Sequence, residues 1–242
     1  MQEVSIVAEP VFHIGSFPVT NSLLTIWVVV ILLCLAAILI SRKIKKDPGP
    51  AQNVAEWVLE NLLDYLQNIA GGRKEAEKFF PIVATIFIMV LASNWIGILP
   101  GVGSIGIHEG EKFIPLFRSV NSDLNMTLAL ALITVVWSHL YGLWIVGIKH
   151  HLGKFFNFHG PIDFFTGILE IVGEISKIIS LSFRLFGNVF AGEVLLIIIG
   201  FLVPYIAPIP FLGLEIFVGF IQALIFATLA MLAFSTFTRL EH

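Results

Sequence analysis

The chain has 242 residues, of which 57% are hydrophobic and 13% are charged, and its formal net charge is −3. Soluble domains are nearer ~45–50% apolar and ~25% charged, so this composition predicts a polytopic membrane protein with one helical domain over residues 1–242. The acidic balance gives no sign of nucleic-acid binding. The single cysteine, Cys34, lies in an apolar run and indicates neither a disulfide framework nor a metal cluster.

The first 20 residues contain Glu3 and Glu9 but no Lys or Arg, unlike a signal or transit peptide, and we interpret residues 1–20 as an external N-terminus. Residues 23–40 form an apolar run in which only Thr25 is polar, long enough for a first span. In membrane proteins, positively charged residues concentrate in the cytoplasmic segments. The basic residues that follow residues 23–40 therefore predict that this span ends on the cytoplasmic side of the membrane. These residues are Arg42, Lys43, Lys45 and Lys46.

A break at 47–50, Asp-Pro-Gly-Pro, separates this span from residues 52–69. There, apolar side chains recur at helical spacing from Val54 and Trp57 to Leu66, with acidic residues elsewhere. The pattern predicts an amphipathic helix along the cytoplasmic membrane surface. A solvated loop helix is the alternative.

The second span is predicted over 79–99 and the third over 124–147, with an external polar loop at 101–123 between them. His139 lies inside the third span. A lone histidine there is more often a satisfied bundle residue than a functional one, and both interpretations stay open.

Charge counting supports this topology, with the N-terminus outside and the C-terminus in the cytoplasm. Lys112 and Arg118 fall outside, and Lys177 and Arg184 lie within helices. The other ten of the 14 Lys and Arg fall in predicted cytoplasmic segments: Arg42, Lys43, Lys45, Lys46, Arg73, Lys74, Lys78, Lys149, Lys154 and Arg239.

The last part of the chain is predicted to form two long helices over 162–203 and 211–238, joined by a proline-rich turn. The first would measure about 60 Å, twice the ~30 Å thickness of bilayer hydrocarbon. We therefore predict a strongly tilted hairpin of two membrane helices. A short cytoplasmic helix followed by an ordinary span is the alternative. With the three earlier spans, the predicted fold is an all-α membrane protein with five membrane helices and one surface helix.

A polar stripe follows one face of the first long helix. On a helical wheel, five of its polar side chains fall within ~40° of one line, and Ser176 and Ser180 flank them. The five are Glu170, Glu174, Lys177, Arg184 and Asn188. Such a row suits a water-filled path, whereas an ordinary surface helix would explain Glu170–Lys177 but not Arg184, whose charge is permanent and costly in a bilayer.

Glu193 faces away from this stripe. On the second long helix, Glu215 and Gln222 share a face, since they are seven residues apart. If the two helices pair antiparallel, Gln222 lies near the depth of Arg184, and Glu215 near that of Glu193. The sequence thus predicts two polar pockets with an arginine between them, an arrangement typical of ion pathways.

The run Ser-Leu-Ser-Phe-Arg-Leu-Phe-Gly-Asn-Val-Phe-Ala-Gly-Glu at 180–193 resembles a motif of the a subunits of F-type ATP synthase membrane sectors. Asn-Trp-Ile-Gly-Ile-Leu-Pro at 94–100 and Ser-Asp-Leu-Asn-Met-Thr at 122–127 are similar to further segments of that family. The resemblance covers nearly the whole chain.

This resemblance implies a stator subunit that contacts a ring of c subunits, each with one carboxylate at mid-membrane depth. Arg184 would be the essential stator charge that each carboxylate meets. Gln222 would position Arg184. The outer half-channel would include Glu193, Glu215, Asn188 and Asp123. The inner half-channel would include Glu170, Glu174, Ser176, Lys177 and Ser180.

We expect a bacterial plasma membrane, because no transit segment is present, and an organelle-encoded version is the alternative. The resemblance also implies protons or Na⁺ as the transported ion. The partners that it implies are the c-ring, subunit b of the peripheral stalk and the rest of the ATP synthase complex. No cofactor or metal is expected, and the chain alone is not expected to be catalytic. A self-contained secondary transporter is an alternative, but the two halves of the sequence share no pattern of the kind that inverted repeats leave. A membrane enzyme is another alternative, and the sequence has no HExxH, nucleophile elbow or phosphate loop.

Overall fold

A computed structural model describes residues 8–42, 44–99, 101–103, 105–109, 112–148, 153 and 160–238. The helices are α1 (Asn21–Ser41), α2 (Pro50–Ala70), α3 (Arg73–Ile96), α4 (Leu124–Val146), α6 (Pro161–Leu202) and α7 (Pro208–Thr238). The strands are β1 (Pro10–Ile14), β2 (Phe17–Thr20), β3 (Gly106–Glu109) and β4 (Lys112–Pro115). A single 3-10 turn, η1 (Val120–Ser122), precedes α4.

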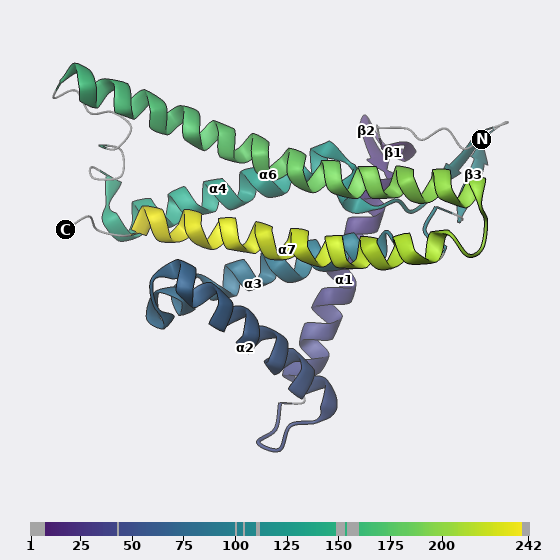
Figure 1. Cartoon of the computed structure of the whole chain (residues 1–242), viewed down its shortest axis with the longest axis horizontal. Helices are drawn as coiled ribbons and strands as arrows, with labels where there is room; N and C mark the ends of the chain where they lie inside the picture. Colours follow the sequence, from purple (N-terminus) through teal and green to yellow (C-terminus); the bar gives the residue numbers. More distant parts are fainter. Residues whose placement is uncertain are drawn as a thin grey trace.

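Five helices in this described part of the chain are long and apolar enough to cross a membrane: α1, α3, α4, α6 and α7. The prediction of a helical membrane protein with five spans is therefore confirmed by length and composition. Figure 1 shows that α3, α4, α6 and α7 run alongside one another, whereas α1 crosses them at a steep angle. α7 packs against α3, α4 and α6 and is the central helix of the bundle.

α6 is one unbroken helix of 42 residues, ~63 Å long at 1.5 Å per residue. A turn at 203–207 leads into α7, whose 31 residues return antiparallel to α6 (Figure 1). Both helices exceed the ~30 Å of bilayer hydrocarbon, so they must tilt or extend beyond it. Their steep angle to α1 agrees with a tilted hairpin, and the tilt relative to a bilayer stays a prediction.

α2 has the predicted apolar stripe, but part of the stripe packs on protein. Leu62 and Leu66 are buried in a core cluster that they share with α3 and α7. Val54 and Trp57, in the first half of the helix, stay exposed. α2 then ends at Gly71, whose positive φ of 86° allows the sharp turn into α3. Its first half alone is therefore open to a membrane surface.

The core is closed at one end by three aromatic rings from three helices. Phe79 of α3 stacks on Phe234 of α7 at a centroid distance of 5.5 Å. Tyr141 of α4 meets both rings edge-on, at 5.7 Å in each case. Such pairs add to the packing of the rings, so this junction fixes the ends of α3, α4 and α7 relative to one another.

Toward the other end, two side chains of α3 bind the backbone of α7. Asn94 Nδ2 donates to the Gly219 carbonyl at 2.9 Å, and Trp95 Nε1 donates to the Ile216 carbonyl at 3.1 Å. Asn94 Oδ1 also accepts from Asn121 Nδ2 at 2.7 Å. These bonds set the height of α7, and hence of Glu215 and Gln222, relative to α3.

Two small β-hairpins were not predicted. β1 and β2 pair antiparallel around Gly15 and Ser16, within the expected external N-terminus. β3 and β4 pair antiparallel within the expected external loop. Both strands of the first hairpin are short, and Gly15 has the positive φ, 64°, that its tight turn requires. A Gly-Ser pair between apolar residues was the signal available in the sequence.

Several sequence-based predictions lie outside the described residues. They concern residues 1–7 of the N-terminus and the basic residues Lys43, Lys149, Lys154 and Arg239.

We expect Asn94→Ala to destabilise the protein, because it removes two interhelical hydrogen bonds. Such bonds in membranes are worth ~0.6 kcal/mol on average and up to ~1.7 kcal/mol, so the loss should be about 1–3 kcal/mol. Thermal unfolding of the detergent-purified protein measures it as a lower Tm. The matched control is Asn61→Ala, since the exposed Asn61 bonds only the Trp57 carbonyl of its own helix. Equal Tm values for the two variants would contradict the anchoring role.

Candidate functional site

Arg184 lies near the middle of α6, on a face that is open in this chain. Its Nη2 donates to Ser180 Oγ, one turn earlier, at 3.2 Å. Among the described residues, no carboxylate lies within ion-pair distance of the guanidinium. The charge is therefore exposed and not neutralised by the described part of its own chain.

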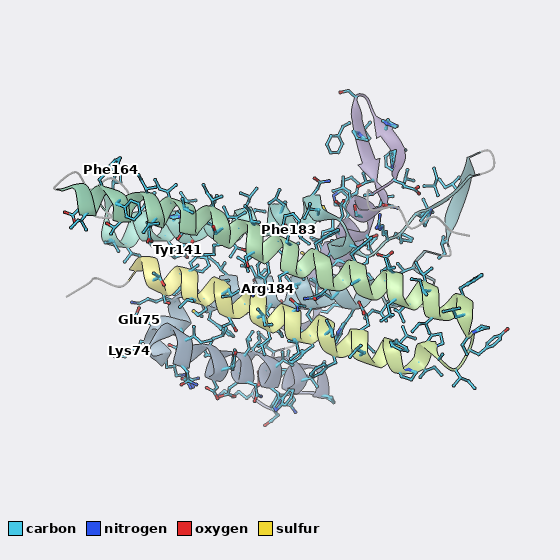
Figure 2. All side chains as sticks on the ribbon, turned by 45° about the horizontal axis from the view of Figure 1, so that its top comes forward. Lys74, Glu75, Tyr141, Phe164, Phe183 and Arg184 are labelled. Carbon is cyan, nitrogen blue, oxygen red and sulfur yellow. The ribbon has the colours of Figure 1, made fainter. Side chains whose placement is uncertain are left out.

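Gln222 of α7 lies beside Arg184, as predicted from antiparallel pairing. The two side chains line one shallow depression between the helices, together with Leu181, Leu185, Ile225 and Phe226. Figure 2 places Arg184 where α6 and α7 run side by side. In the described structure the hydrogen bond of Arg184 goes to Ser180 rather than to Gln222, so Gln222 is close enough to affect Arg184 without holding it directly.

Glu193 and Glu215 also come together across the α6–α7 pair. Each lies within electrostatic range of the other, and like charges so placed repel. The Glu215 carboxylate packs against Gly192, where a Cβ atom would overlap it. Glycine at this position is what gives the carboxylate its room between the helices.

Glu193 has a second neighbour that the sequence did not suggest. Arg118, a buried residue just before η1, places its Nε 3.9 Å from Glu193 Oε1. The other carboxylate oxygen, Oε2, is buried and has no hydrogen-bond partner among the described residues. Glu193 therefore combines a fixed cation on one oxygen with an oxygen that is available to a proton.

Asp123 belongs to the same region but is held more firmly. Its Oδ2 accepts from Ser22 Oγ of α1 at 2.7 Å, and its Oδ1 caps α4 by accepting from the Asn125 N–H at 2.9 Å. Arg118 Nε also donates to Ser122 Oγ at 3.0 Å. Because Ser122 directly precedes Asp123 in the chain, this bond links Asp123 to the Arg118–Glu193 pair. We call Arg118, Asp123, Glu193 and Glu215 the outer cluster.

On the N-terminal half of α6, Glu174 is the best-buried member of the predicted stripe, with 9% of its surface exposed. Lys177 Nζ donates to Glu174 Oε1 at 2.7 Å. Glu174 Oε2 lies 3.5 Å from Nε2 of His139, which comes from α4. We call His139, Glu174 and Lys177 the inner cluster.

The remaining stripe residues are less constrained. Glu170 and Asn188 are half-buried, and Ser176 is exposed. The serine that does pack toward α4 is Ser182, which is fully buried and shares a hydrogen bond of 3.1 Å with Thr127. The predicted stripe is therefore split, because Glu174 faces α4 while Arg184 stays open.

Along α6, the two clusters lie on opposite sides of Arg184. Glu174 and Glu193 are 19 residues apart, or ~28 Å along an α-helix, with Arg184 about midway. In the described residues no three His, Cys, Asp or Glu side chains form a group suited to a metal ion. The arrangement suits the movement of a small cation along polar side chains.

Comparison with known proteins identifies the family of this chain. A model of the family described as ATP synthase A chain matches residues 23–235. A protein of Syntrophobacter fumaroxidans named ATP synthase subunit a is 35% identical over 226 residues, which cover 91% of this chain and 85% of that protein. Proteins of the same name from two Campylobacter jejuni strains are each 36% identical. One alignment covers 96% of this chain and 90% of the relative, and the other, from subspecies doylei, covers 90% and 84%. The match spans the membrane helices and both clusters, and the chain belongs to the ATP synthase A chain family.

Proposed function

We propose that this chain is the proton-channel stator subunit of an F-type ATP synthase, with Arg184 as the fixed charge that separates two half-channels. The observation that carries the proposal is the Arg184 guanidinium, which lies on an open face of a membrane helix without a carboxylate partner among the described residues. A charge placed there is expensive unless it acts on something. Family membership supports a moving carboxylate of a c subunit as its partner.

The outer cluster is proposed as the external half-channel. Glu193 and Glu215 would take up protons from outside, and Asp123 and Asn188 would line the approach. Glu193 suits this role, since one of its oxygens is buried and has no hydrogen-bond partner among the described residues. The Glu215 carboxylate, which packs against Gly192 next to Glu193, lies beside it in the same region.

The inner half-channel is proposed to follow α6 from Ser180 through Ser176, Lys177 and Glu174 to Glu170. Ser180 joins it to the arginine through the hydrogen bond from Arg184. The proposed direction is cytoplasmic, which rests on the positive charges after α1. The N-terminus is then external, and the host membrane is proposed to be a bacterial plasma membrane.

Arg184 acts in this scheme through its charge. A positive charge within ~4–6 Å favours the ionised form of a carboxyl group, so a protonated c-subunit carboxyl arriving at Arg184 releases its proton. The same charge repels a proton that would pass straight from the outer to the inner cluster. Each ion must then travel with the ring, and a charge crossing 100 mV supplies ~2.3 kcal/mol to rotation.

A self-contained secondary transporter would also need intramembrane charges. Discontinuous helices at the membrane midplane are characteristic of such proteins, whereas α6 and α7 are continuous over their charged residues. The stator function is therefore the better account. Its proposed partners are the c-ring, subunit b and the rest of the synthase, and the coupling ion is a proton, with Na⁺ as the alternative.

We expect Arg184→Ala to abolish ATP-driven proton pumping and to raise passive proton leak, because the electrostatic barrier between the clusters is lost. Both quantities can be measured in inverted membrane vesicles that contain the assembled complex. Arg73→Ala is the matched control, because Arg73 forms only exposed ion pairs with Asp64 and Glu77, and it should pump at the wild-type rate. Normal pumping by Arg184→Ala would refute the stator assignment.

Glu193→Gln should assemble normally but pump several-fold more slowly. The amide keeps the shape of the side chain beside Arg118, whose Nε lies 3.9 Å from Glu193 Oε1, yet it cannot carry a proton. Pumping rate is measured together with the amount of assembled complex, and Glu77→Gln, at an exposed carboxylate, serves as the control. Loss of assembly in Glu193→Gln would instead make Glu193 a packing residue.

Gly192→Ala should slow pumping with little change in Tm. The new methyl group would displace the Glu215 carboxylate, and a flexible side-chain end moves at small energetic cost. Gly200→Ala on the same helix meets open space and is the control. Unchanged pumping by Gly192→Ala would show that the position of Glu215 against α6 does not matter for transport.

A further inference from the structure

We propose that His139 is a proton-carrying residue of the inner half-channel and that it works as a pair with Glu174. This inference rests on the proposed function, since it adds a residue to the inner side of the same ion path. From the sequence alone, His139 could have either a packing or a functional role. The structure brings it from α4 to the buried carboxylate of α6.

The His139 imidazole and the Glu174 carboxylate lie close together. His139 Nε2 lies 3.5 Å from Glu174 Oε2, and the Glu174 carboxylate is nearly buried. Lys177 occupies the other oxygen, Oε1, at 2.7 Å. The oxygen that faces His139 is thus separate from the one that Lys177 binds, so a proton on the imidazole gains a negative neighbour without displacing the lysine.

The charged groups around the His139 imidazole decide the net charge of the inner cluster. α6 contributes Glu174 and Lys177, which form an ion pair, and Glu170, which is half-buried one turn before Glu174. The described part of α7, which also packs on α4, has one charged residue, Glu215, far along the helix in the outer cluster. On α4 itself the other titratable side chain is Tyr141. The inner cluster is therefore neutral when His139 is neutral and carries a single positive charge when His139 is protonated.

The acid–base chemistry of imidazole suits His139 to carrying a proton. Among the side chains at this end of the path, imidazole alone ordinarily titrates between about pH 5 and 8. Lys177 and Glu174 form an ion pair at 2.7 Å. When a proton enters from the cytoplasm, it binds an imidazole nitrogen, Glu174 stabilises the imidazolium, and the imidazole then releases the proton toward Ser180 and Arg184. No bond other than N–H or O–H changes.

Exposure agrees with a role at the inner end of the path. For the side-chain atoms alone, the exposed fraction is 25% in His139, 34% in Lys177 and 12% in Glu174. The imidazole therefore has a side open to its surroundings and a side facing the carboxylate. Glu174 lies ten residues before Arg184, or ~15 Å along the helix, which leaves Ser180 and Ser176 as intermediate positions.

The competing account is a structural clamp, in which His139 holds α4 against α6. The two accounts differ for His139→Gln. Glutamine keeps an N–H donor for Glu174 but cannot carry a proton, so a clamp predicts that it restores function. His139→Phe removes both properties.

The experiment measures ATP-driven proton uptake by the intact complex in inverted vesicles as the pH on the cytoplasmic face is varied between about 6 and 8, the range in which imidazole titrates. We expect His139→Gln to assemble at the wild-type level and to pump several-fold more slowly, with the greatest loss at the alkaline end, where protons are scarcest. Glu174→Gln should give a similar profile. The double variant should be no slower than the worse single variant, because the two residues act as a unit.

His13→Gln is the matched control, since His13 is exposed on β1, away from the inner cluster. A wild-type rate and pH profile for His139→Gln would overturn the proposal, and so would a loss of assembly in that variant. The control for the underlying function is Arg184→Ala. If Arg184→Ala fails to pump while His139→Gln matches the wild type, the inference about His139 alone is wrong. If Arg184→Ala pumps normally, the stator function itself is wrong.

Discussion

The structure depends on a permanent positive charge held within a membrane helix. Arginine cannot lose its proton under any physiological condition, so Arg184 needs a negative partner wherever it meets an apolar surface. The described part of its own chain supplies only the hydroxyl of Ser180. The acidic residues of α6 and α7 lie instead toward the two ends of the helices, in separate clusters. An exposed guanidinium without a carboxylate partner in the described part of the chain agrees with the proposal that Arg184 acts on a passing carboxylate of another subunit.

An unbroken α6 is what keeps the two clusters apart. A kink or a short connecting loop would let Glu174 and Glu193 approach, whereas a continuous helix holds them ~28 Å apart with Arg184 between. α7 follows α6 closely because small residues allow it, as Gly192 does beside Glu215. Asn94 and Trp95 then fix the height of α7 through its backbone carbonyls. The distance between the two clusters is therefore a consequence of helix geometry, and the height of α7 beside them is a consequence of hydrogen bonds from α3.

Much of this arrangement could be predicted from the sequence, and the part that could not has a physical reason. Apolar runs mark the spans, and counting along an antiparallel pair places Gln222 beside Arg184 and Glu215 beside Glu193. Contacts from other elements were missed, since a sequence does not show how α4 is rotated against α6. His139 and Ser182 therefore became significant only in the structure. Arg118 was counted as a loop charge and is buried against Glu193. The two hairpins were missed because strands of four or five residues carry little periodic signal.

The two clusters differ in charge, and this difference bears on how fast ions enter each of them. With all groups ionised, the outer cluster holds three carboxylates, Asp123, Glu193 and Glu215, and one cation, Arg118. In the inner cluster, Glu174 is balanced by Lys177. A cleft lined by one sign of charge raises the local concentration of the opposite ion, so in the proposed scheme the outer cluster concentrates cations more strongly than the inner one. Such an asymmetry changes how fast ions enter from each side, while the direction of net flow is set by the electrochemical gradient across the membrane.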